Sequence, residues 1–273
     1  MRRTRRSRTI TLATAALLLA AAIAFTTGAE PAAAAGPVRV MDFNICGSIC
    51  NHGVIDKPGA TDIVDEVRNR VRHFKPHILT LNEVCIAQFQ RLKALFAGGS
   101  WKMRGVFRPQ RNDSRCRKGT SYGDAVFSSA GVHGQKVLQL PDPPKGPENR
   151  AILCIRTSAG GGPVLACTLH LVTRDPMKAK QIAAAARALN DEAEDGAVIL
   201  GGDFNKTPSG MGALLDPDRG GRFFDVDPQK APTRGQKIDY ILFSRAHFAN
   251  PSGGPHSSPL SDHDVLLGQA TRR

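Results

Sequence analysis

The sequence is poor in the aromatic residues that membrane-docking proteins expose, with one tryptophan and two tyrosines. This scarcity argues against docking on a lipid surface through an aromatic element. After residue 35 the chain also lacks an apolar run near the roughly 20 residues that a membrane helix needs. Paired CxxC cysteines are missing, which argues against a structural zinc cluster. Without repeats or a long linker, residues 36–273 are expected to form one domain.

Residues 1–35 have the composition of a secretory signal. Five arginines precede an apolar stretch from Ile10 to Phe25, and small residues follow up to Ala35. Cleavage after Ala35 would release residues 36–273 as a secreted protein; an uncleaved signal anchor is the alternative, and the arginines do not separate the Sec route from the twin-arginine route. Because the leader holds five arginines and one glutamate, residues 36–273 keep nine of the chain's thirteen net positive charges. That balance suits an anionic partner.

All six cysteines lie in the mature part, and an even number in an exported chain predicts disulfides. Cys154 and Cys167 stand symmetrically about a turn near Gly160 and Gly161, so they should face each other across a hairpin. The second choice is Cys46–Cys50, which leaves Cys85–Cys116 as the third pair.

Short apolar runs alternate with helical stripes along the chain. Strands are expected at residues 38–45, 78–81, 101–107, 125–128, 151–156, 164–171, 197–200, 238–243 and 265–267. Helices are expected at 63–74, 86–95 and 177–193, whereas the basic stretch 108–120 and the proline-rich stretch 141–147 are expected to be loops. This mixture, with a hairpin among the strands, indicates an α/β or α+β domain with sheets in its core.

Polar side chains recur where these apolar strands end. They are Asn44, Glu83, His170, Asp203, Asn205, Asp239, Asp262 and His263. One such residue is usually a turn former, but if the strand ends converge, the whole set makes a pocket of carboxylates and two imidazoles. Oxygen ligands suit Mg²⁺, Mn²⁺ or Ca²⁺ better than Zn²⁺, and histidines suit acid–base work. Together these groups could hydrolyse a phosphate ester.

Six motifs in order resemble the signature of the endonuclease/exonuclease/phosphatase superfamily, which includes deoxyribonuclease I. They are DFN at 42–44, LNEV at 81–84, TLHL at 168–171, GGDFN at 201–205, IDYILFS at 238–244 and SDHD at 261–264. The resemblance implies an α/β fold, a four-layered α/β sandwich with two central mixed β-sheets. It places the active site at one edge of the sandwich.

The same resemblance implies roles for the strand-end residues. Mg²⁺ would be held by Glu83 with Asn44 and Asp262; Mn²⁺ or Ca²⁺ are alternatives. Asp203 and Asn205 would orient water and a phosphate oxygen. His263, held by Asp239, would activate the nucleophile, and His170 would donate a proton or hydrogen bond to the phosphate. The expected products are a free hydroxyl and a phosphomonoester.

A second group of residues resembles supporting elements of deoxyribonuclease I. Tyr122 and Asp124 match a Tyr-x-acid element whose acid pairs with the histidine at position 170, and Arg150 matches an arginine that supports the phosphate. Asn82 departs from the family, in which glutamine is usual, and so does Cys85.

The substrate is expected to be nucleic acid, and DNA in particular, cut internally. Arg111, Arg115 and Arg117 crowd a basic loop that leads into Tyr122, where they could contact phosphates while the aromatic ring packs on sugars or bases. A solvated basic loop is the alternative. The other functions considered are a sphingomyelinase or phospholipase, a phosphomonoesterase, and an inactive binding protein, although none of the family's site residues is missing. We expect a monomer without stable membrane association.

Overall fold

The structure, a computed structural model, describes residues 36–51, 62–116, 119–142, 149–228 and 235–273. The predicted signal lies outside these ranges. Within them, no helix combines the length and apolarity needed to cross a membrane. The unit Ala35–Arg273 is built on two six-stranded sheets, here called sheet A and sheet B.

Sheet A joins the two ends of the unit, because the first strand lies between the last strand and the second. Its order is β11 (Phe248–His256), β12 (Val265–Arg272), β1 (Val38–Asn44), β2 (Ile78–Cys85), β4 (Ser121–Ser128) and β3 (Arg104–Asn112). β1 runs parallel to β2 and antiparallel to β12, so the sheet is mixed.

Sheet B has the equivalent mixed arrangement. Its order is β5 (Gly134–Gln139), β6 (Ala151–Ala159), β7 (Gly162–His170), β8 (Val198–Asp203), β10 (Asp239–Ser244) and β9 (Phe223–Asp225). The pair β7–β8 is parallel and the other neighbours are antiparallel.

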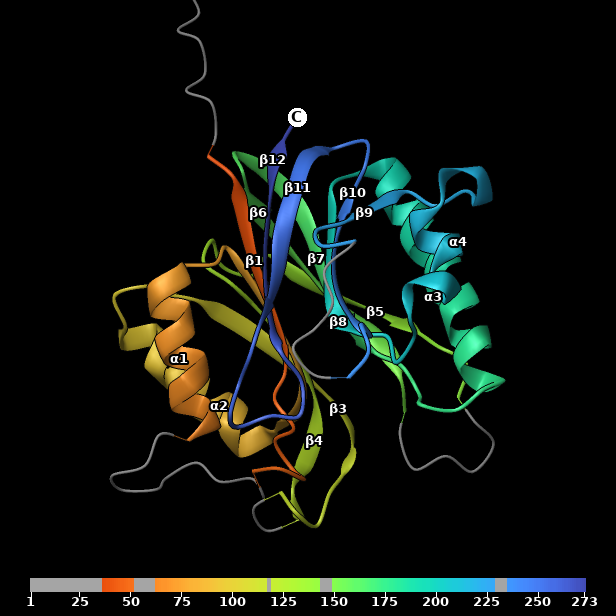
Figure 1. Cartoon of the computed structure of the whole chain (residues 1–273). Coiled ribbons are helices and arrows are strands. Elements are labelled where there is room, and N and C mark those ends of the chain that lie inside the picture. The colour runs from red at the N-terminus through yellow and green to blue at the C-terminus, as the bar shows by residue number, and fades with distance from the viewer. Residues whose placement is uncertain (1–35, 52–61, 117–118, 143–148, 229–234) are drawn as a thin grey trace, which may run out of the picture. The chain divides into compact units, whose positions relative to one another are not determined.

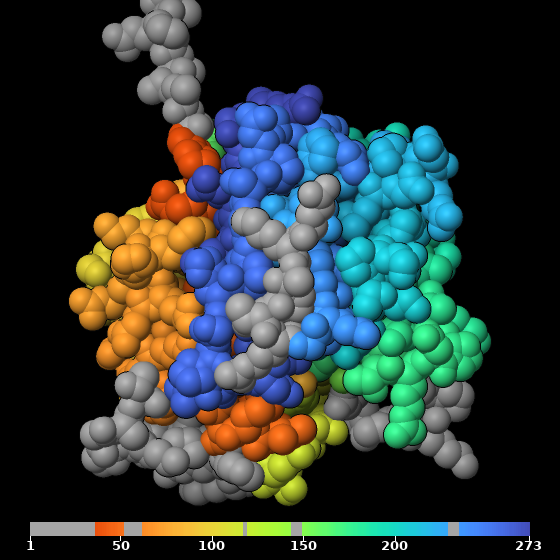
Figure 2. Space-filling model, viewed as in Figure 1, coloured from red at the N-terminus to blue at the C-terminus, as the bar shows by residue number. Residues whose placement is uncertain are grey.

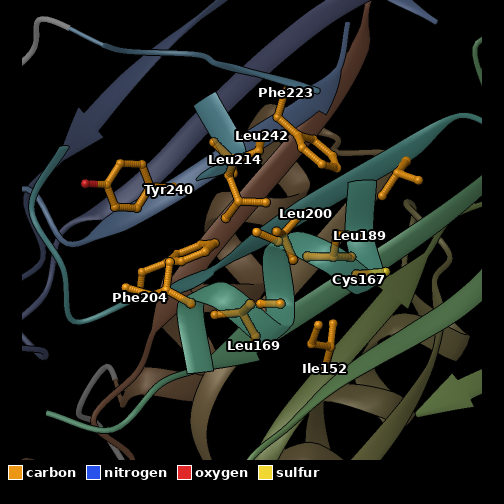
Figure 3. Close-up of a cluster of buried hydrophobic side chains, with 14 of the residues drawn as sticks. Ile152, Cys167, Leu169, Leu189, Leu200, Phe204, Leu214, Phe223, Tyr240 and Leu242 are labelled. Atoms are coloured by element: carbon orange, nitrogen blue, oxygen red, sulfur yellow. The ribbon is translucent and has the colours of Figure 1, made fainter. Parts of the chain in front are cut away.

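Helices cover the outer face of each sheet, giving four layers (Figure 1). α1 (Ile63–Phe74) and α2 (Ile86–Gly98) share a buried cluster with sheet A, whereas α3 (Met177–Asp195) and α4 (Gly212–Leu215) share one with sheet B (Figure 3). A third buried cluster, which includes Val40, Ile155 and Ile199, lies between the sheets. In the space-filling view, the blue surface of β11 and β12 separates the orange surface of α1 from that of α4 (Figure 2). The predicted four-layered sandwich is confirmed.

Local signals explain how the first helix is bounded. The Asp62 side chain accepts a hydrogen bond from the backbone N–H of Asp65 (2.9 Å) and caps the N-terminus. At the other end Lys75 adopts a left-handed conformation (φ 53°), and Pro76 follows. These signals end α1 at Phe74, so that the chain can enter β2 at Ile78.

Three strands are not predicted from the sequence, and others are longer than expected: β4 begins at Ser121 rather than at residue 125, and β12 continues to Arg272 rather than ending at residue 267. β5, β9 and β11 were not anticipated, because β9 is very short and β11 contains two prolines and two glycines. β3 extends to Asn112, into a stretch expected to be a loop, because it pairs with β4 across a register shift at Pro109. All three predicted disulfides are present: Cys46–Cys50, Cys85–Cys116 and Cys154–Cys167.

Candidate active site

The ends of neighbouring strands bring the predicted polar residues to one edge of the sandwich. In sheet B, Asp203 lies opposite His170 of β7 on one side and opposite Asp239 of β10 on the other. In sheet A, Asn44 of β1 lies opposite Asn82 of β2. Backbone register fixes these positions, and the segments after β8 and before β12 add Asn205, Asp262 and His263.

Asp203 is the centre of this group and is almost fully buried. Its Oδ2 accepts a hydrogen bond from Asn44 Nδ2 (3.1 Å) and lies 3.5 Å from His170 Nε2 and 3.7 Å from His263 Nε2. Its Oδ1 accepts from the backbone N–H of Asn205 (2.8 Å), which has a left-handed conformation. Burial, reinforced by Asp239, raises the pKa of Asp203 to about 7. One carboxylate thus faces both imidazoles.

His263 is held across the two sheets. It follows β11 in the loop that leads to β12, yet its Nδ1 pairs with Asp239 Oδ2 of sheet B at 2.8 Å. Burial acts to lower the pKa of His263, but Asp239 and the nearby carboxylates Asp203 and Asp262 outweigh it and raise the pKa to about 10. The ring is therefore fixed in orientation, with Nε2 directed toward Asp203 and Asn44.

Glu83 stands at a break in strand β2, where the pairing with β4 shifts register. Its backbone is left-handed (φ 59°), which is costly for a residue other than glycine. The backbone N–H of Gly47 donates to its carbonyl (2.9 Å) and helps to hold this conformation. Burial raises the pKa of the Glu83 carboxyl, although hydrogen bonds from Asn44 and Tyr122 act in the opposite direction. The carboxylate therefore points out of the sheet edge into the site.

His170 lies on the other side of the same space, with Nε2 3.9 Å from Glu83 Oε1. Burial lowers the pKa of this imidazole well below its usual value, and the guanidinium groups of Arg150 and Arg111 add to the effect. Arg150 is itself buried and donates from Nη1 to the carbonyl of His170 (3.0 Å). His170 is thus a neutral imidazole at neutral pH.

The donor set around Glu83 fits a hard divalent cation. Glu83, Asp262 and the amide oxygen of Asn44 offer oxygen ligands of the kind that Mg²⁺, Mn²⁺ and Ca²⁺ take. Asp239 Oδ1 is buried and has no hydrogen-bond partner among the described residues. Burial raises the pKa of both the Glu83 and the Asp203 carboxyl, with Asp262 adding to the effect at Glu83 and Asp239 at Asp203, so a bound cation would stabilise their charged forms.

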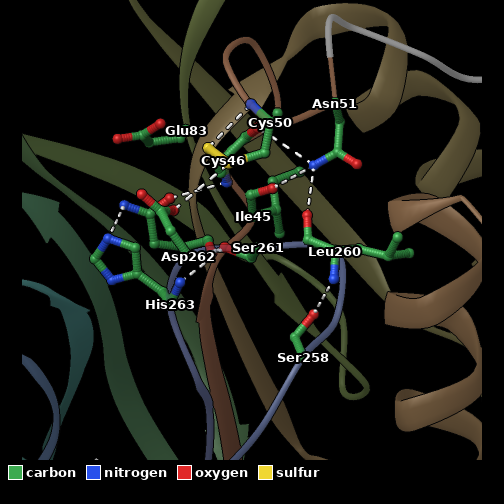
Figure 4. The surroundings of a disulfide bond; sticks show 12 residues. Ile45, Cys46, Cys50, Asn51, Glu83, Ser258, Leu260, Ser261, Asp262 and His263 are labelled. Atoms are coloured by element: carbon green, nitrogen blue, oxygen red, sulfur yellow. Dashed lines mark hydrogen bonds between the residues drawn. A yellow bond between two sulfur atoms is a disulfide. The ribbon is translucent and has the colours of Figure 1, made fainter. Parts of the chain in front are cut away.

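Asp262 occupies the exposed rim of the site (Figure 4). Its Oδ1 lies 3.7 Å from the Cys50 sulfur, which carries no proton because it is bonded to Cys46. The two cysteines are therefore unavailable as metal ligands although they lie close to Asp262.

Asn82 ties the two sheets together directly beneath the site. Its Nδ2 lies within hydrogen-bonding distance of Asp124 Oδ1 (2.9 Å), Thr168 Oγ1 (3.2 Å) and the Leu169 carbonyl (3.1 Å). Its Oδ1 accepts from the backbone N–H of Asp203 (3.0 Å). The departure from the family's usual glutamine therefore falls on the residue that joins sheet A to the central carboxylate.

Two of the expected substrate contacts differ from the prediction. Asp124 does not pair with His170: it is buried, and its carboxylate accepts from Asn82 and Gln110 instead. Tyr122 cannot stack on a base, because it is almost fully buried beside the Cys85–Cys116 disulfide and under Arg111. Both residues support the site from within.

Strand β3 and the loop after it place two arginines of the basic stretch near the site, Arg111 close to His170 and Arg115 close to Glu83. Asp113 binds both, through Arg111 Nη2 (2.6 Å) and through Arg115 Nε and Nη2 (3.0 and 2.9 Å). The hydrogen bonds from Arg115 hold the pKa of Asp113 well below its usual range. Arg117 lies outside the described residues. The two described arginines are therefore fixed in place by one carboxylate.

A second buried charge cluster, which shares a small pocket with Asp239, has no signal in the sequence. Lys237 pairs with Asp225 (3.4 Å) and more closely with Asp227, and its ammonium lies over the ring of Tyr240. Burial raises the pKa of Asp225 to about 7 in spite of Lys237. Neither this cluster nor the role of Asp113 carries a signal in the sequence, since isolated acids occur in many turns.

The chain matches one protein family and several solved structures with a similar fold. The model of the Endonuclease/Exonuclease/phosphatase family matches residues 43–263. Among solved structures, an endonuclease/exonuclease/phosphatase from Beutenbergia cavernae matches with a TM-score of 0.64 and 21% identity over 86% of this chain and 72% of that one. The human Nocturnin catalytic domain gives 0.67 and 17% over 87% and 94%, and truncated Caenorhabditis elegans TDP2 gives 0.59 and 18% over 86% and 98%. The curated proteins contain no match.

Proposed function

Because the chain belongs to the endonuclease/exonuclease/phosphatase family, we propose that it is a divalent-metal-dependent phosphodiesterase that cuts DNA internally. Members of this family hydrolyse phosphoric esters. The observation that carries the proposal is the position of Asp203, with one oxygen within 4 Å of both His170 and His263. A water molecule and a phosphoryl group between two imidazoles need such a carboxylate for orientation and proton transfer.

The metal would be held by Glu83 with Asn44 and Asp262. When bound, it supplies Lewis-acid polarisation of a phosphoryl oxygen and neutralises developing negative charge. Two of these residues come from β1 and β2 of sheet A, and Asp262 comes from the loop that leads into β12 of the same sheet.

The remaining steps belong to the chain's own side chains. Asp203 and Asn205 orient the attacking water, and the Asp203 carboxylate takes its proton. His263, which is protonated because its pKa is raised to about 10, stabilises the negative charge beside Asp203 while Asp239 holds the imidazole. His170, neutral because its pKa is lowered by burial, donates a hydrogen bond from Nε2 to the phosphate. The water attacks in line, so a free hydroxyl and a phosphomonoester leave without a covalent enzyme intermediate.

The charge around the site favours a polyanionic substrate. Arg111 and Arg115 are already ordered by Asp113, so binding a phosphate would cost them little conformational entropy. The Nocturnin catalytic domain holds a sulfate anion, which resembles a phosphate group in size and shape. The surplus of basic residues after residue 35 would add long-range attraction for DNA.

The test is a parallel assay of the purified protein with Mg²⁺ on plasmid DNA, RNA, sphingomyelin vesicles and a panel of phosphomonoesters. We expect nicked and then fragmented plasmid, with less activity on the other substrates. Cleavage of sphingomyelin or a phosphomonoester by a protein that leaves DNA and RNA intact would contradict the nuclease assignment. If the protein left circular plasmid intact and degraded linearised plasmid only from its ends, internal cleavage would be contradicted.

The three disulfides are typical of proteins in oxidising compartments. Together with the leader-like residues 1–35, they support our proposal that the protein is secreted. We also propose that it acts as a monomer. N-terminal sequencing of protein recovered from the culture medium should begin at Gly36, and sedimentation should give one subunit. Retention of residues 1–35 on a membrane-bound protein would contradict secretion.

A further inference from the structure

The loop that follows β1 is fixed rigidly beside the metal-binding side of the site (Figure 4). The Cys46–Cys50 disulfide closes it, and the backbone N–H of Gly47 donates to the Glu83 carbonyl (2.9 Å). Asn51 then ties its end to the carbonyl of Leu260 (2.9 Å), in the segment that leads to Asp262. The loop thus keeps a constant position relative to both Glu83 and Asp262.

Ile49 projects from this loop into solvent. It is 52% exposed and is the single large hydrophobic side chain exposed among the described residues. It cannot fold inward by a shift of the loop, because Ser48 is already buried and Gly47 is packed so tightly that a Cβ would come within 2.2 Å of Gln88 Oε1. A lone exposed isoleucine is ordinary elsewhere on a surface, but here it adjoins Cys50, whose sulfur lies 3.7 Å from Asp262.

The arginine pair also lies near Glu83, because Arg115 feels the Glu83 charge and Arg111 lies over Tyr122. The loop that bears Arg115 is closed onto strand β2 by the Cys85–Cys116 disulfide, two residues beyond Glu83. In the space-filling view, the red-orange surface of the segment 45–51 adjoins a yellow surface near the end of β3 and β4 at the lower edge (Figure 2). Two loops that are each closed by a disulfide therefore lie near the Glu83 carboxylate. One exposes the apolar side chain of Ile49, and the other bears the cationic side chain of Arg115.

We propose that Ile49 is a specificity-determining residue that packs against the base or sugar next to the scissile phosphate. A polynucleotide alternates anionic phosphates with flat, weakly polar bases. The arginines would contact the phosphates, and Ile49 would contact a base. A small phosphomonoester would reach the metal site without meeting Ile49. This inference rests on the proposed function and narrows it to polymers that carry intact bases.

The test compares two oligonucleotides of equal charge. One is an oligothymidylate, and the other carries tetrahydrofuran abasic units in place of the thymidines, so that the phosphates are unchanged. The full-length protein and its I49S, I49V and R115Q variants are assayed with Mg²⁺. We expect I49S to lower kcat/KM on the oligothymidylate by about fivefold relative to its effect on the abasic strand, the scale of burying half of an isoleucine. I49V should restore most of this difference.

R115Q is the matched comparison from the loop that bears Arg115. It should weaken cleavage of both strands equally and flatten the salt dependence, since it removes a phosphate contact. Equal effects of I49S on the two strands, in a wild-type protein that cleaves both, would overturn the role of Ile49 and leave the nuclease assignment intact. A wild-type protein that cleaves neither strand would overturn both. Loss of vesicle binding in I49S without loss of strand cleavage would identify a lipid contact and overturn the inference.

Discussion

The two sheets position their share of the site by different means. On the sheet B side, His170, Asp203 and Asp239 occupy paired positions on three adjacent strands, so the backbone ladder fixes them. On the sheet A side, Glu83 has a left-handed backbone at a register shift, and the arginine loop and the loop of Ile49 are each closed by a disulfide. Catalytic precision on one side comes from regular structure, and on the other side from covalent links and side-chain hydrogen bonds.

Metal removal gives the largest expected effect. EDTA should abolish activity, and Mg²⁺ should restore it. If the cation belongs to the sheet A side, Glu83→Gln should raise the Mg²⁺ concentration for half-maximal rate by roughly 10–100-fold, at least the cost of losing an outer-shell partner of a metal. Asp203→Asn should lower the rate while leaving that concentration nearly unchanged. Rates measured over a Mg²⁺ series test this difference.

An equal shift in Mg²⁺ requirement for both variants would show that the metal lies between the two sheets. Full activity of the wild-type protein in metal-free buffer would contradict metal dependence altogether. Circular dichroism of each variant serves as the control for folding.

Loss of the His263–Asp239 pair, which joins the two sheets, should give the next largest effect on activity. His263→Ala removes an imidazole anchored on Asp239 at 2.8 Å, and kcat should fall by ~10²–10⁴-fold, the usual cost of impairing general acid–base catalysis. KM for DNA should change little, because the arginines remain bound to Asp113. Steady-state kinetics on an oligonucleotide separates the two parameters, and unchanged kcat would refute the assignment.

Two of the three disulfides sharpen the comparison, because Cys85–Cys116 ties the arginine loop to β2 of sheet A, whereas Cys154–Cys167 joins two strands of sheet B. Cys85→Ala/Cys116→Ala and Cys154→Ala/Cys167→Ala should each lower the free energy of unfolding by about 3–4 kcal/mol in the chain-entropy model. Only the first should also raise KM for DNA and reduce its salt dependence, since Cys154–Cys167 joins β6 and β7 within the sheet B core.

Urea unfolding and the salt series provide both readouts. A KM that is unchanged in the Cys85–Cys116 variant would mean that hydrogen bonds alone hold the arginine loop.

The smallest expected effect concerns the acid pair bound by Lys237 at the edge of sheet B. In the folded protein the pKa of Asp225 is about 7, whereas an aspartate in an unfolded chain titrates near 3.9. Between these values the folded state binds more protons than the unfolded state. The contribution of Asp225 to the free energy of unfolding therefore falls as pH rises from about 4 to 7, and is constant above that range.

Asp225→Asn removes this dependence. Its free energy of unfolding, relative to wild type, should rise between pH 5 and pH 7.5 in urea titrations. Asp227→Asn is the matched control and should destabilise at both values, because it removes the closer partner of Lys237. A pH-independent difference for Asp225→Asn would show that Lys237 keeps the carboxylate charged.

The sequence predicts most of what depends on local pattern. Strand-end residues such as Asn44 and Asp203 could be placed because apolar alternation marks where a strand ends, and Cys154 and Cys167 could be paired because a glycine turn sets their register. The pairing of Asp124 was wrong, because its partner is chosen by side chains from other strands. Asn82, Asp113 and Lys237 carry no periodic signal, so their contacts emerge only in the folded chain.

The network of Asn82 limits how this chain can change by substitution. Both polar atoms of its side-chain amide make hydrogen-bond contacts, and these involve four groups from β4, β7 and β8. Glutamine at this position would need room for one more methylene between the sheets, and Asp124, Thr168 and the segment around Asp203 would have to move with it. Asn82→Gln should therefore be tolerated only together with substitutions at its partners. The effects of substitutions at Asn82 and at these partners should not be additive.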